Sequence, residues 1–357
     1  MHWLDHMGPL RTGGWVHGYV RIVWAVLWFW AAAWSAGRDV LFLAASDSHY
    51  RHPDHPLGHH NDMNRATIEE MNRVEELEWP RKLGGGRVGR PRGVVMLGDL
   101  VDDGDLAVGG RVVTREQWSR FIEDIGLDGT DGRLRWPVFE TWGNHDGPPA
   151  AAARCGFSVQ AQIAERNRCR LQAGRIGRVS KSGLHYSWDW DDVHFVMLGL
   201  YPADQASRQA RYSPVWHDPQ GARSFLREDL EERVGQSGRP VVLMSHCGFD
   251  TDWWTPPDWR AVYDVAHRYR VILYLYGHTG TGIRAWAPEG EPVRWDCINT
   301  GHLDAGFFVV HISSNKIRAA YRCKEGLQYV KDAQGRSTAQ WGGQWKWSWE
   351  WEQPLNP

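Results

Sequence analysis

The chain has 357 residues, enough for one large domain with a sizeable core or for two smaller ones. Its 41 lysines and arginines nearly balance its 43 aspartates and glutamates, so charge gives no support to nucleic-acid binding or to electrostatic adhesion to a membrane. None of its five cysteines forms a Cys-x-x-Cys pair, which argues against a structural zinc site. Cys155 and Cys169 are close enough in sequence to pair, but ordinary thiols are the simpler interpretation.

The N-terminal segment, residues 1–37, has the pattern of an export signal. Arg11 and Arg21 precede an unbroken apolar stretch at 22–33, and small residues follow as cleavage sites. The stretch is shorter than the ~18–20 residues that span a bilayer. We therefore favour a cleaved signal over a short membrane anchor, and we expect an exported protein, periplasmic or extracellular, with at most N-terminal membrane contact.

Strand-like and helix-like segments alternate after this signal. In chain order, the pattern predicts a strand at 40–45, a helix at 64–77, a strand at 93–97, a helix at 115–125, a strand at 137–141, a hairpin at 185–190 with 193–200, a helix at 222–234, a strand at 240–244, a helix at 261–268, a strand at 271–276 and a hairpin at 307–312 with 317–321. The stretch 147–180 has no clean period. Strands that alternate with helices predict an α/β core, and the hairpins predict some antiparallel sheet.

Five short motifs rich in Asp, Asn and His directly follow five of these strands. They are Asp47-Ser48-His49, Gly98-Asp99-Leu100-Val101-Asp102, Gly143-Asn144-His145-Asp146, Ser245-His246 and Gly277-His278-Thr279-Gly280. Carboxylate, amide and imidazole groups suit one or two divalent metals. Ligands of open α/β sheets collect at the carboxyl ends of strands, where all five motifs lie. The sequence therefore predicts a metal site at these ends.

In this order, the motifs resemble those of the calcineurin-like metallophosphoesterases over roughly residues 40–312. The resemblance implies a four-layer α/β fold, a mixed two-sheet β-sandwich flanked by helices. We assign this domain to residues 38–325, followed by a Trp-rich tail at 326–357. The implied activity is hydrolysis of a phosphomonoester or phosphodiester, with a small-molecule, lipid or sugar phosphate as substrate and no nucleic acid as partner.

The resemblance also implies a pair of divalent or trivalent metal ions, either iron, manganese or zinc. The implied ligands are Asp47 and His49 for the first ion, Asn144, His246 and His278 for the second, and Asp99 as a bridge between them. Two ions can clamp the attacking and leaving oxygens of an in-line displacement. They also lower the pKa of a bound water, which supplies a hydroxide nucleophile.

The resemblance gives His145 and Asp146 catalytic roles. His145 would face the substrate and stabilise the transition state or protonate the leaving oxygen, help that typically contributes about 10²–10⁴-fold. Asp146 would orient the ring of His145 through its other nitrogen. Asp102 is expected to support the loop or a ligand and not to bind metal.

Gly280 departs from the family pattern, which has a second metal-binding histidine at this position. Three explanations are open. His302, after the next expected strand, substitutes for the missing ligand; or the first ion is held by Asp47, His49 and Asp99, since catalytic zinc commonly has three protein ligands plus water. In the third, the first ion binds weakly or not at all, and the protein is mononuclear or a non-catalytic binding module.

Other polar and aromatic residues have alternative interpretations. Arg166, Arg168 and Arg170 would face an anionic substrate or form an exposed basic helix face. Trp253 and Trp254 would wall the substrate site or simply pack. Four histidines are expected to be structural: His185, His194, His267 and His311.

The Trp-rich tail contains an alternating pattern. Trp345, Trp347, Trp349 and Trp351 alternate with polar residues, which predicts that all four rings lie on one face of a strand. That face would cover the core or bind a sugar or a partner, and core cover is the simpler interpretation.

Overall fold

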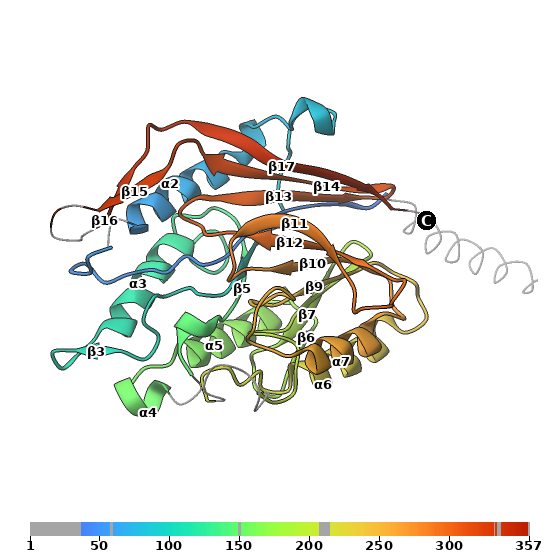
Figure 1. Ribbon diagram of the computed structural model, residues 1–357, viewed down its shortest axis with the longest axis horizontal. Coiled ribbons are helices and arrows are strands. Elements are labelled where there is room, and N and C mark those ends of the chain that lie inside the picture. Colours follow the sequence, from blue (N-terminus) through green and yellow to red (C-terminus); the bar gives the residue numbers. More distant parts are fainter. Residues whose placement is uncertain are drawn as a thin grey trace, which may run out of the picture. The chain divides into compact units, whose positions relative to one another are not determined.

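Two mixed β-sheets pack face to face at the centre of the fold. The first contains β1 (Asp39–Ala45), β2 (Val94–Leu97), β5 (Val138–Thr141), β13 (Gly306–Ser313), β14 (Lys316–Lys324) and β17 (Trp345–Pro354). The second contains β6 (Arg178–Val179), β7 (Tyr186–Trp190), β8 (Val193–Met197), β9 (Val241–Met244), β10 (Val271–Tyr276), β11 (Thr281–Trp286) and β12 (Trp295–Thr300). Their orders are β17-β14-β13-β1-β2-β5 and β11-β12-β10-β9-β8-β7-β6, and Figure 1 shows the two sheets stacked.

The computed structural model describes residues 37–57, 60–148, 151–206, 215–331, 333 and 337–355. The predicted export signal, residues 1–37, lies outside the described residues except for Gly37, so it stays a prediction. In the part of the chain that is described, no helix is both long and apolar enough to cross a membrane. All five cysteines are free thiols.

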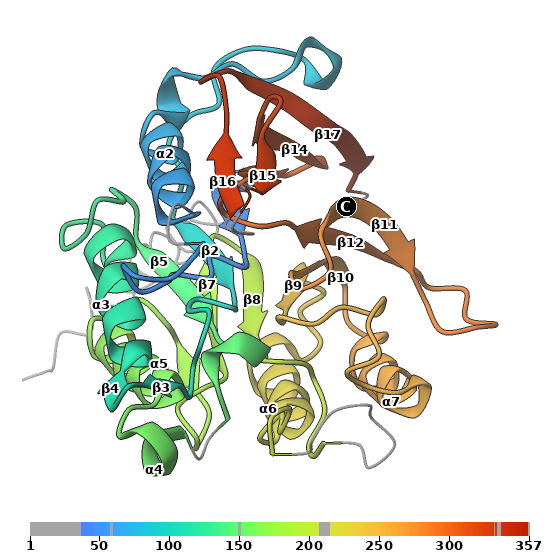
Figure 2. The ribbon, with the colours of Figure 1, turned by 60° about the vertical axis from the view of Figure 1, so that its left-hand side comes forward.

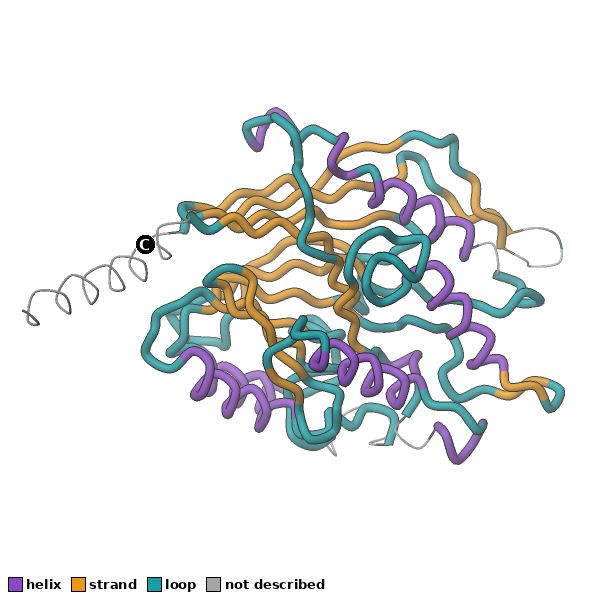
Figure 3. The backbone as a smooth tube through the Cα atoms, turned by 180° about the vertical axis from the view of Figure 1, so that it is seen from behind, coloured by secondary structure: helices purple, strands orange, loops and turns teal. Residues whose placement is uncertain are grey.

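Helices cover the outer faces of the two sheets, which gives the four layers that the sequence predicts (Figure 3). The helices are α2 (His60–Asn72), α3 (Val113–Ile125), the short α4 (Ala151–Cys155), α5 (Val159–Gln172), α6 (Ala222–Asp229) and α7 (Pro256–Ala266). Alternation along each strand divides the core in two. In β1, Phe42 and Ala44 face the cluster between the sheets, whereas Leu41 and Leu43 face the helices.

The elements expected from the sequence are present, and the structure adds several that were not expected, among them a long helix. Helix α5 lies inside the stretch 147–180, where the sequence showed no period. The reason is that the buried face of α5 includes charged side chains: Arg166 and Arg170 are 8% and 1% exposed because both pair with the buried Glu140. An apolar period cannot reveal a helix that buries arginines.

The prediction that four tryptophans of the tail share one face is wrong. The segment is an edge strand, β17, paired with β14 (Figure 2). Trp347 packs against the cluster under the helices, whereas Trp351 packs against the cluster between the sheets. The cause is a bulge: Trp349 has a left-handed φ of 48° and the register with β14 shifts nearby, which switches the faces.

Two tryptophans of β17 lie opposite positively charged side chains of the neighbouring strand β14. The Lys324 ammonium lies 4.5 Å from the ring of Trp345, and the Arg322 guanidinium lies 5.3 Å from the ring of Trp347. Such cation–π contacts fix the strand on the domain. The C-terminal segment is therefore part of the six-stranded sheet.

A buried histidine of the second sheet, held between two carboxylates, predicts a pH dependence of stability. His194 on β8 lies 2.7 Å from Asp189 and 2.8 Å from Asp229, and these carboxylates are themselves approached by Arg239 and Arg178. Burial alone would lower the pKa of His194, but the two carboxylates outweigh it and raise the pKa. A raised pKa gives stability that is complete below the unfolded value of about 6.5 and is lost as pH rises through the folded value.

We therefore expect His194→Gln to lower the free energy of unfolding by about 2 kcal/mol near pH 6 and by less at high pH. Urea unfolding followed by fluorescence between pH 5.5 and 9 measures the gap between wild type and variant. His267→Gln, at an exposed position after α7, is the control. A gap that stays constant over this range contradicts the assignment.

Candidate metal centre

Five loops meet at the carboxyl ends of β1, β2, β5, β9 and β10. The strands β1, β2 and β5 are parallel in one sheet, and β9 and β10 are parallel in the other, so each set ends at one edge. Hydrogen bonds join the two edges: the backbone N–H of His278 donates to the Asp47 carboxylate at 3.0 Å, and the His246 ring lies 2.7 Å from the Leu97 carbonyl. The motifs therefore converge on one place.

Asp47, His49, Asp99 and His278 have left-handed backbone conformations. Their φ values are 51°, 40°, 52° and 71°, in a region that residues other than glycine rarely adopt. Such conformations cost of order 1–3 kcal/mol each and persist only where the surrounding structure imposes them. Four strained residues among the predicted ligands mark this place as a functional site.

Asp99 stands at the centre of the cluster and is 2% exposed. Its Oδ1 accepts the backbone N–H of His145 at 2.8 Å, while its Oδ2 lies 3.3 Å from His246 Nε2 and 3.7 Å from His49 Nε2. Burial alone would raise the pKa of Asp99, but His246, His145 and His49 together hold it well below its usual range. The carboxylate is thus charged and placed between two imidazoles.

Gly143 lets the third loop approach this carboxylate. A Cβ at Gly143 would lie 2.2 Å from Asp99 Oδ1 and 2.7 Å from His246 Cε1, closer than real atoms pack. Only glycine allows the backbone to pass here. The glycine of this motif is therefore explained by the packing of the site.

On one side of Asp99 lie the residues predicted for the first ion. His49 Nε2 is 3.8 Å from Asp47 and 3.7 Å from Asp99, and His49 Nδ1 is 3.1 Å from Asp102. Burial lowers the pKa of His49, but the three carboxylates outweigh it and raise the pKa to about 9. Asp102 behind the ring directs Nε2 toward the other two carboxylates, as in known metal sites.

On the other side lie Asn144, His246 and His278. His246 Nε2 is 3.0 Å from the Asn144 side-chain oxygen, and the rings of His246 and His278 are 5.1 Å apart. Burial lowers the pKa of His246, but Asp99 outweighs it and raises the pKa to about 9. Burial and the neighbouring His246 lower the pKa of His278 to about 4, which keeps its lone pair available.

The cluster contains overlapping groups of possible metal ligands. Ligand atoms of Asp47, Asp99 and His246 lie within 4.8 Å of one another, and so do those of His49, Asp99 and His145. Both groups contain Asp99. Cys247, which is not among the predicted ligands, forms a similar group through its sulfur with His246 and His278. In the sequence, the signal for this residue was that a thiol directly follows the histidine of the fourth motif.

The predicted role of Asp146 is wrong. Its carboxylate accepts the backbone N–H groups of Leu100 and Val101 at 2.9 Å each and of Gly143 at 2.7 Å. Because Asn144–Asp146 form a 3-10 turn, this side chain folds back beneath the loops and away from the His145 ring. Burial and the charge of Asp99 raise the pKa of Asp146 to about 7. Asp146 therefore fixes the second and third loops.

The ring of His145 is held instead by the second motif. Its Nδ1 lies 2.9 Å from the backbone carbonyl of Asp102 and 4.0 Å from the Asp102 carboxylate. A carbonyl only accepts hydrogen bonds, so Nδ1 carries the proton and Nε2 is left for another partner. The side chain is 44% exposed, which suits a group that meets a substrate.

Gly280 and His302 occupy different places relative to the cluster. Gly280 has a φ of +118°, and no atom lies within 4 Å of the place where its Cβ would be. The ring of His302 stacks on that of His49, with 5.6 Å between centroids. The backbone of His302 pairs with Ser46, beside the first motif. His302 is thus the neighbour of a predicted first-ion ligand.

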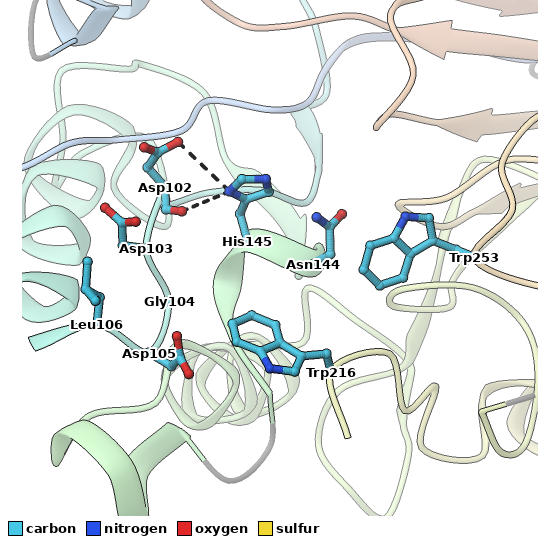
Figure 4. Close-up of a pocket in the computed structure, with 9 residues that line it drawn as sticks. All are labelled: Asp102, Asp103, Gly104, Asp105, Leu106, Asn144, His145, Trp216 and Trp253. Carbon is cyan, nitrogen blue, oxygen red and sulfur yellow. Dashed lines mark hydrogen bonds and ion pairs between the residues drawn. The ribbon is translucent and has the colours of Figure 1, made fainter. Parts of the chain in front are cut away.

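A pocket of about 530 Å³ opens beside the cluster (Figure 4). Its lining residues are Asp102, Asp103, Gly104, Asp105, Leu106, Asn144, His145, Trp216 and Trp253. For Trp253, a wall of the substrate site and ordinary packing were both open; it lines this pocket, and its ring lies 5.6 Å from that of His278. Trp254 is instead 1% exposed in the core. Asp103 and Asp105, which follow the second motif in the sequence, were not predicted to line the pocket, although their position next to the motif pointed to it.

The arginine cluster of α5 does not face this pocket. Arg166 and Arg170 are buried against Glu140, as described above, which excludes their role in anion binding. Arg168 forms an exposed pair with Glu165 on the same helix. The exposed basic face was therefore correct for Arg168 alone.

Three solved structures are similar to this chain at low sequence identity. The structure is similar to GAP50, the anchor in the inner membrane complex of Plasmodium, with 12% identity over 80% of this chain and 85% of that one and a TM-score of 0.45. It is also similar to a 5'-nucleotidase precursor from Thermus thermophilus, with 14% identity over 87% of this chain and 54% of that one and a TM-score of 0.39. A third similar structure, the NAD nucleotidase of Haemophilus influenzae, has 13% identity over 86% of this chain and 54% of that one and a TM-score of 0.38.

No curated protein matched the sequence. The family model for calcineurin-like phosphoesterases matches residues 40–281, which is more than half of the chain and contains the five motifs. The protein therefore belongs to the calcineurin-like phosphoesterase family.

Proposed function

We propose that this protein hydrolyses phosphomonoesters or phosphodiesters of small molecules with two metal ions held around Asp99. One observation carries the proposal: donor side chains from four other loops surround a buried, charged carboxylate, Asp99 of the second motif, at the edge of an open pocket. The proposed first ion takes Asp47 and His49, and the second takes Asn144, His246 and His278. The mixed oxygen and nitrogen donors suit iron, manganese or zinc.

The surrounding residues explain how such a site would act on a phosphate ester. When bound, the ions neutralise phosphate charge and lower the pKa of water to supply a nucleophile for in-line attack. Asn144 contributes a neutral oxygen, so the donor set does not add negative charge that would repel phosphate. His145 donates its Nδ1–H to the backbone carbonyl of Asp102, which leaves Nε2 toward the substrate. With both ring nitrogens protonated, Nε2 would deliver a proton to the leaving oxygen.

Metal analysis and turnover test the proposal together. Protein purified without chelators is expected to contain divalent metal and to hydrolyse 4-nitrophenyl phosphate or bis(4-nitrophenyl) phosphate. Treatment with EDTA should abolish turnover, and manganese, zinc or iron should restore it. Protein that holds no metal and turns over neither ester with any of these ions contradicts the proposal.

His145→Ala separates catalysis from metal binding. We expect kcat to fall by about 10²–10⁴-fold, with the metal content unchanged because the proposed ligand set does not include His145. Turnover assays and mass-spectrometric metal analysis of the same preparation measure both. A variant with wild-type kcat and unchanged metal content would show that His145 gives no acid–base help to catalysis.

For the first ion, we propose that His302 replaces the ligand that Gly280 lacks. The support is its stacking on His49 and the pairing of its backbone with Ser46. His302 is exposed, so core packing does not fix its ring, which we propose turns toward an ion beside His49.

His302→Ala is expected to lower the metal content from two ions per chain to one after dialysis at micromolar free metal. The reason is that the first ion would keep only Asp47, His49 and Asp99. The exposed His267→Ala is the matched control. Two retained ions with unchanged kcat would show that three protein ligands suffice on this side.

We also propose that residues 1–37 direct export and are removed. The support is the basic, apolar and small-residue order of this segment. Sequencing of the mature N-terminus tests it: a start near Gly37 is expected, and a chain that retains residues 22–33 indicates an anchor instead.

A further inference from the structure

The pocket beside the metal centre has an unusual charge for a phosphate-binding protein. Three carboxylates line it, from Asp102, Asp103 and Asp105, and none of the described lining residues is an arginine or a lysine. A phosphate group carries negative charge, which these carboxylates repel. The rest of the pocket must therefore accommodate another part of the substrate.

The three carboxylates differ in how far they are neutralised. Asp102 pairs with Arg51 at 3.1 Å, and Asp105 pairs with Arg154. Asp103 instead accepts a hydrogen bond of 2.9 Å from the side-chain amide of Gln117, which is neutral. Asp103 thus keeps a negative charge at the pocket that no described ion pair offsets.

Two indole rings complete the pocket. Figure 4 shows the 102–106 segment along one side, Trp216 and Trp253 along the others, and His145 and Asn144 between them. Trp216 is half-buried and Trp253 is 6% exposed. Indole faces attract cations, and aromatic walls with carboxylates are the usual setting for ammonium groups.

We propose that the substrate is a phosphate ester that carries an ammonium group, of the choline or ethanolamine type. This inference rests on the proposed function, because His145 and Asn144 belong both to the pocket and to the metal centre. The phosphate lies at the metal centre, and the ammonium group, two or more carbons away, lies between Trp216 and the Asp103 side of the pocket. The carboxylates exclude substrates with a second phosphate in that position.

Calorimetry with a matched pair of ligands tests the pocket without requiring turnover. Phosphocholine and 3,3-dimethylbutyl phosphate have nearly the same shape, but only the first carries a positive charge. We expect metal-loaded protein to bind phosphocholine at least about tenfold more tightly. Equal affinity for the two ligands, or tighter binding of 3,3-dimethylbutyl phosphate, overturns the proposal.

Substitutions in the pocket then test which residues bind the ammonium group. Asp103→Asn and Trp216→Leu are each expected to reduce the preference for phosphocholine by about threefold to tenfold, while Asp62→Asn, at an exposed position on α2, leaves it unchanged. Circular dichroism and metal content confirm that each variant is folded and loaded. A preference that survives both pocket variants contradicts this placement of the ammonium group.

Turnover distinguishes a soluble source of the ester from a lipid source. Hydrolysis of glycerophosphocholine or of phosphatidylcholine vesicles supports the proposal and identifies the source. Hydrolysis of neither, together with rapid hydrolysis of a diester that lacks the ammonium group, such as 3,3-dimethylbutyl 4-nitrophenyl phosphate, overturns it. If no ester at all is hydrolysed, the proposed function fails, and the calorimetric comparison still decides the ammonium preference.

Discussion

Replacing Asp99 with asparagine is expected to abolish hydrolysis and to strip metal from the protein. Asp99 is the one described carboxylate that lies within 4 Å of both His49 and His246, so no neighbouring group takes over its position between the two proposed ion sites. Loss of the several kcal/mol that metal ions contribute to transition-state stabilisation corresponds to about a thousandfold or more in kcat. Metal analysis should show at most one ion per chain.

A second readout of Asp99→Asn does not depend on metal. In metal-free protein the charge of Asp99 is the main reason that the pKa of His246 rises to about 9 against the effect of burial. The variant should therefore show a lower pKa for His246, measured from the pH dependence of its ring proton chemical shift. Asp264→Asn, at an exposed position on α7, is the control. Retention of two ions and of wild-type kcat would refute the central place of Asp99.

Replacing Glu140 with glutamine is expected to cause the largest loss of stability. Glu140 is fully buried, lies 2.6 Å from Arg166 and also pairs with Arg170. Glutamine keeps the shape but leaves two buried guanidinium groups without a counter-charge. Removing one partner of a buried ion pair costs about 3–5 kcal/mol, so the melting temperature should fall by about 6–15 °C.

The pH dependence of this effect has a defined sign. Burial alone would raise the pKa of Glu140, but the two arginines outweigh it and lower the pKa. The stabilisation is therefore present above the unfolded pKa of about 4.3 and is lost as pH falls through the folded value. The difference in melting temperature between wild type and Glu140→Gln should therefore become smaller as the pH is lowered. Calorimetry between pH 3 and 7 measures this difference.

Glu165→Gln on the same helix is the matched control for Glu140→Gln. Glu165 forms an exposed pair with Arg168, and exposed pairs contribute little because water screens them. We expect no measurable change in melting temperature. A Glu140 variant as stable as this control would mean that the buried network does not hold α5 against the sheet.

The candidate metal centre was largely predictable because its chemistry is local in sequence. Each ligand directly follows a strand, and parallel strands end at a common edge, so order and residue type were enough to bring Asp47, Asp99 and His246 together. The role of Asp146 was not predictable in the same way. Whether a carboxylate turns toward a ring or toward backbone N–H groups depends on a single turn, which the residue order does not determine.

Helix α5 and the tail show a second limit. Periodicity identifies a helix only when its buried face is apolar, and Arg166 and Arg170 become buried through Glu140, a residue of a separate strand. The face of a tryptophan in β17 depends on a bulge at Trp349, which shifts the alternation by one residue. Both outcomes follow from pairing with elements distant in the chain.

The sequence by itself determined the α/β alternation, the family and the candidate ligands around Asp99, because strand ends and donor types are properties of short segments. The tertiary structure alone decided which charges are buried in pairs, where His302 stands and what lines the pocket. Asp103 and Trp216 are more than a hundred residues apart, and only folding makes them walls of one cavity. Long-range packing, which decides burial and charge compensation, has no local pattern in the chain.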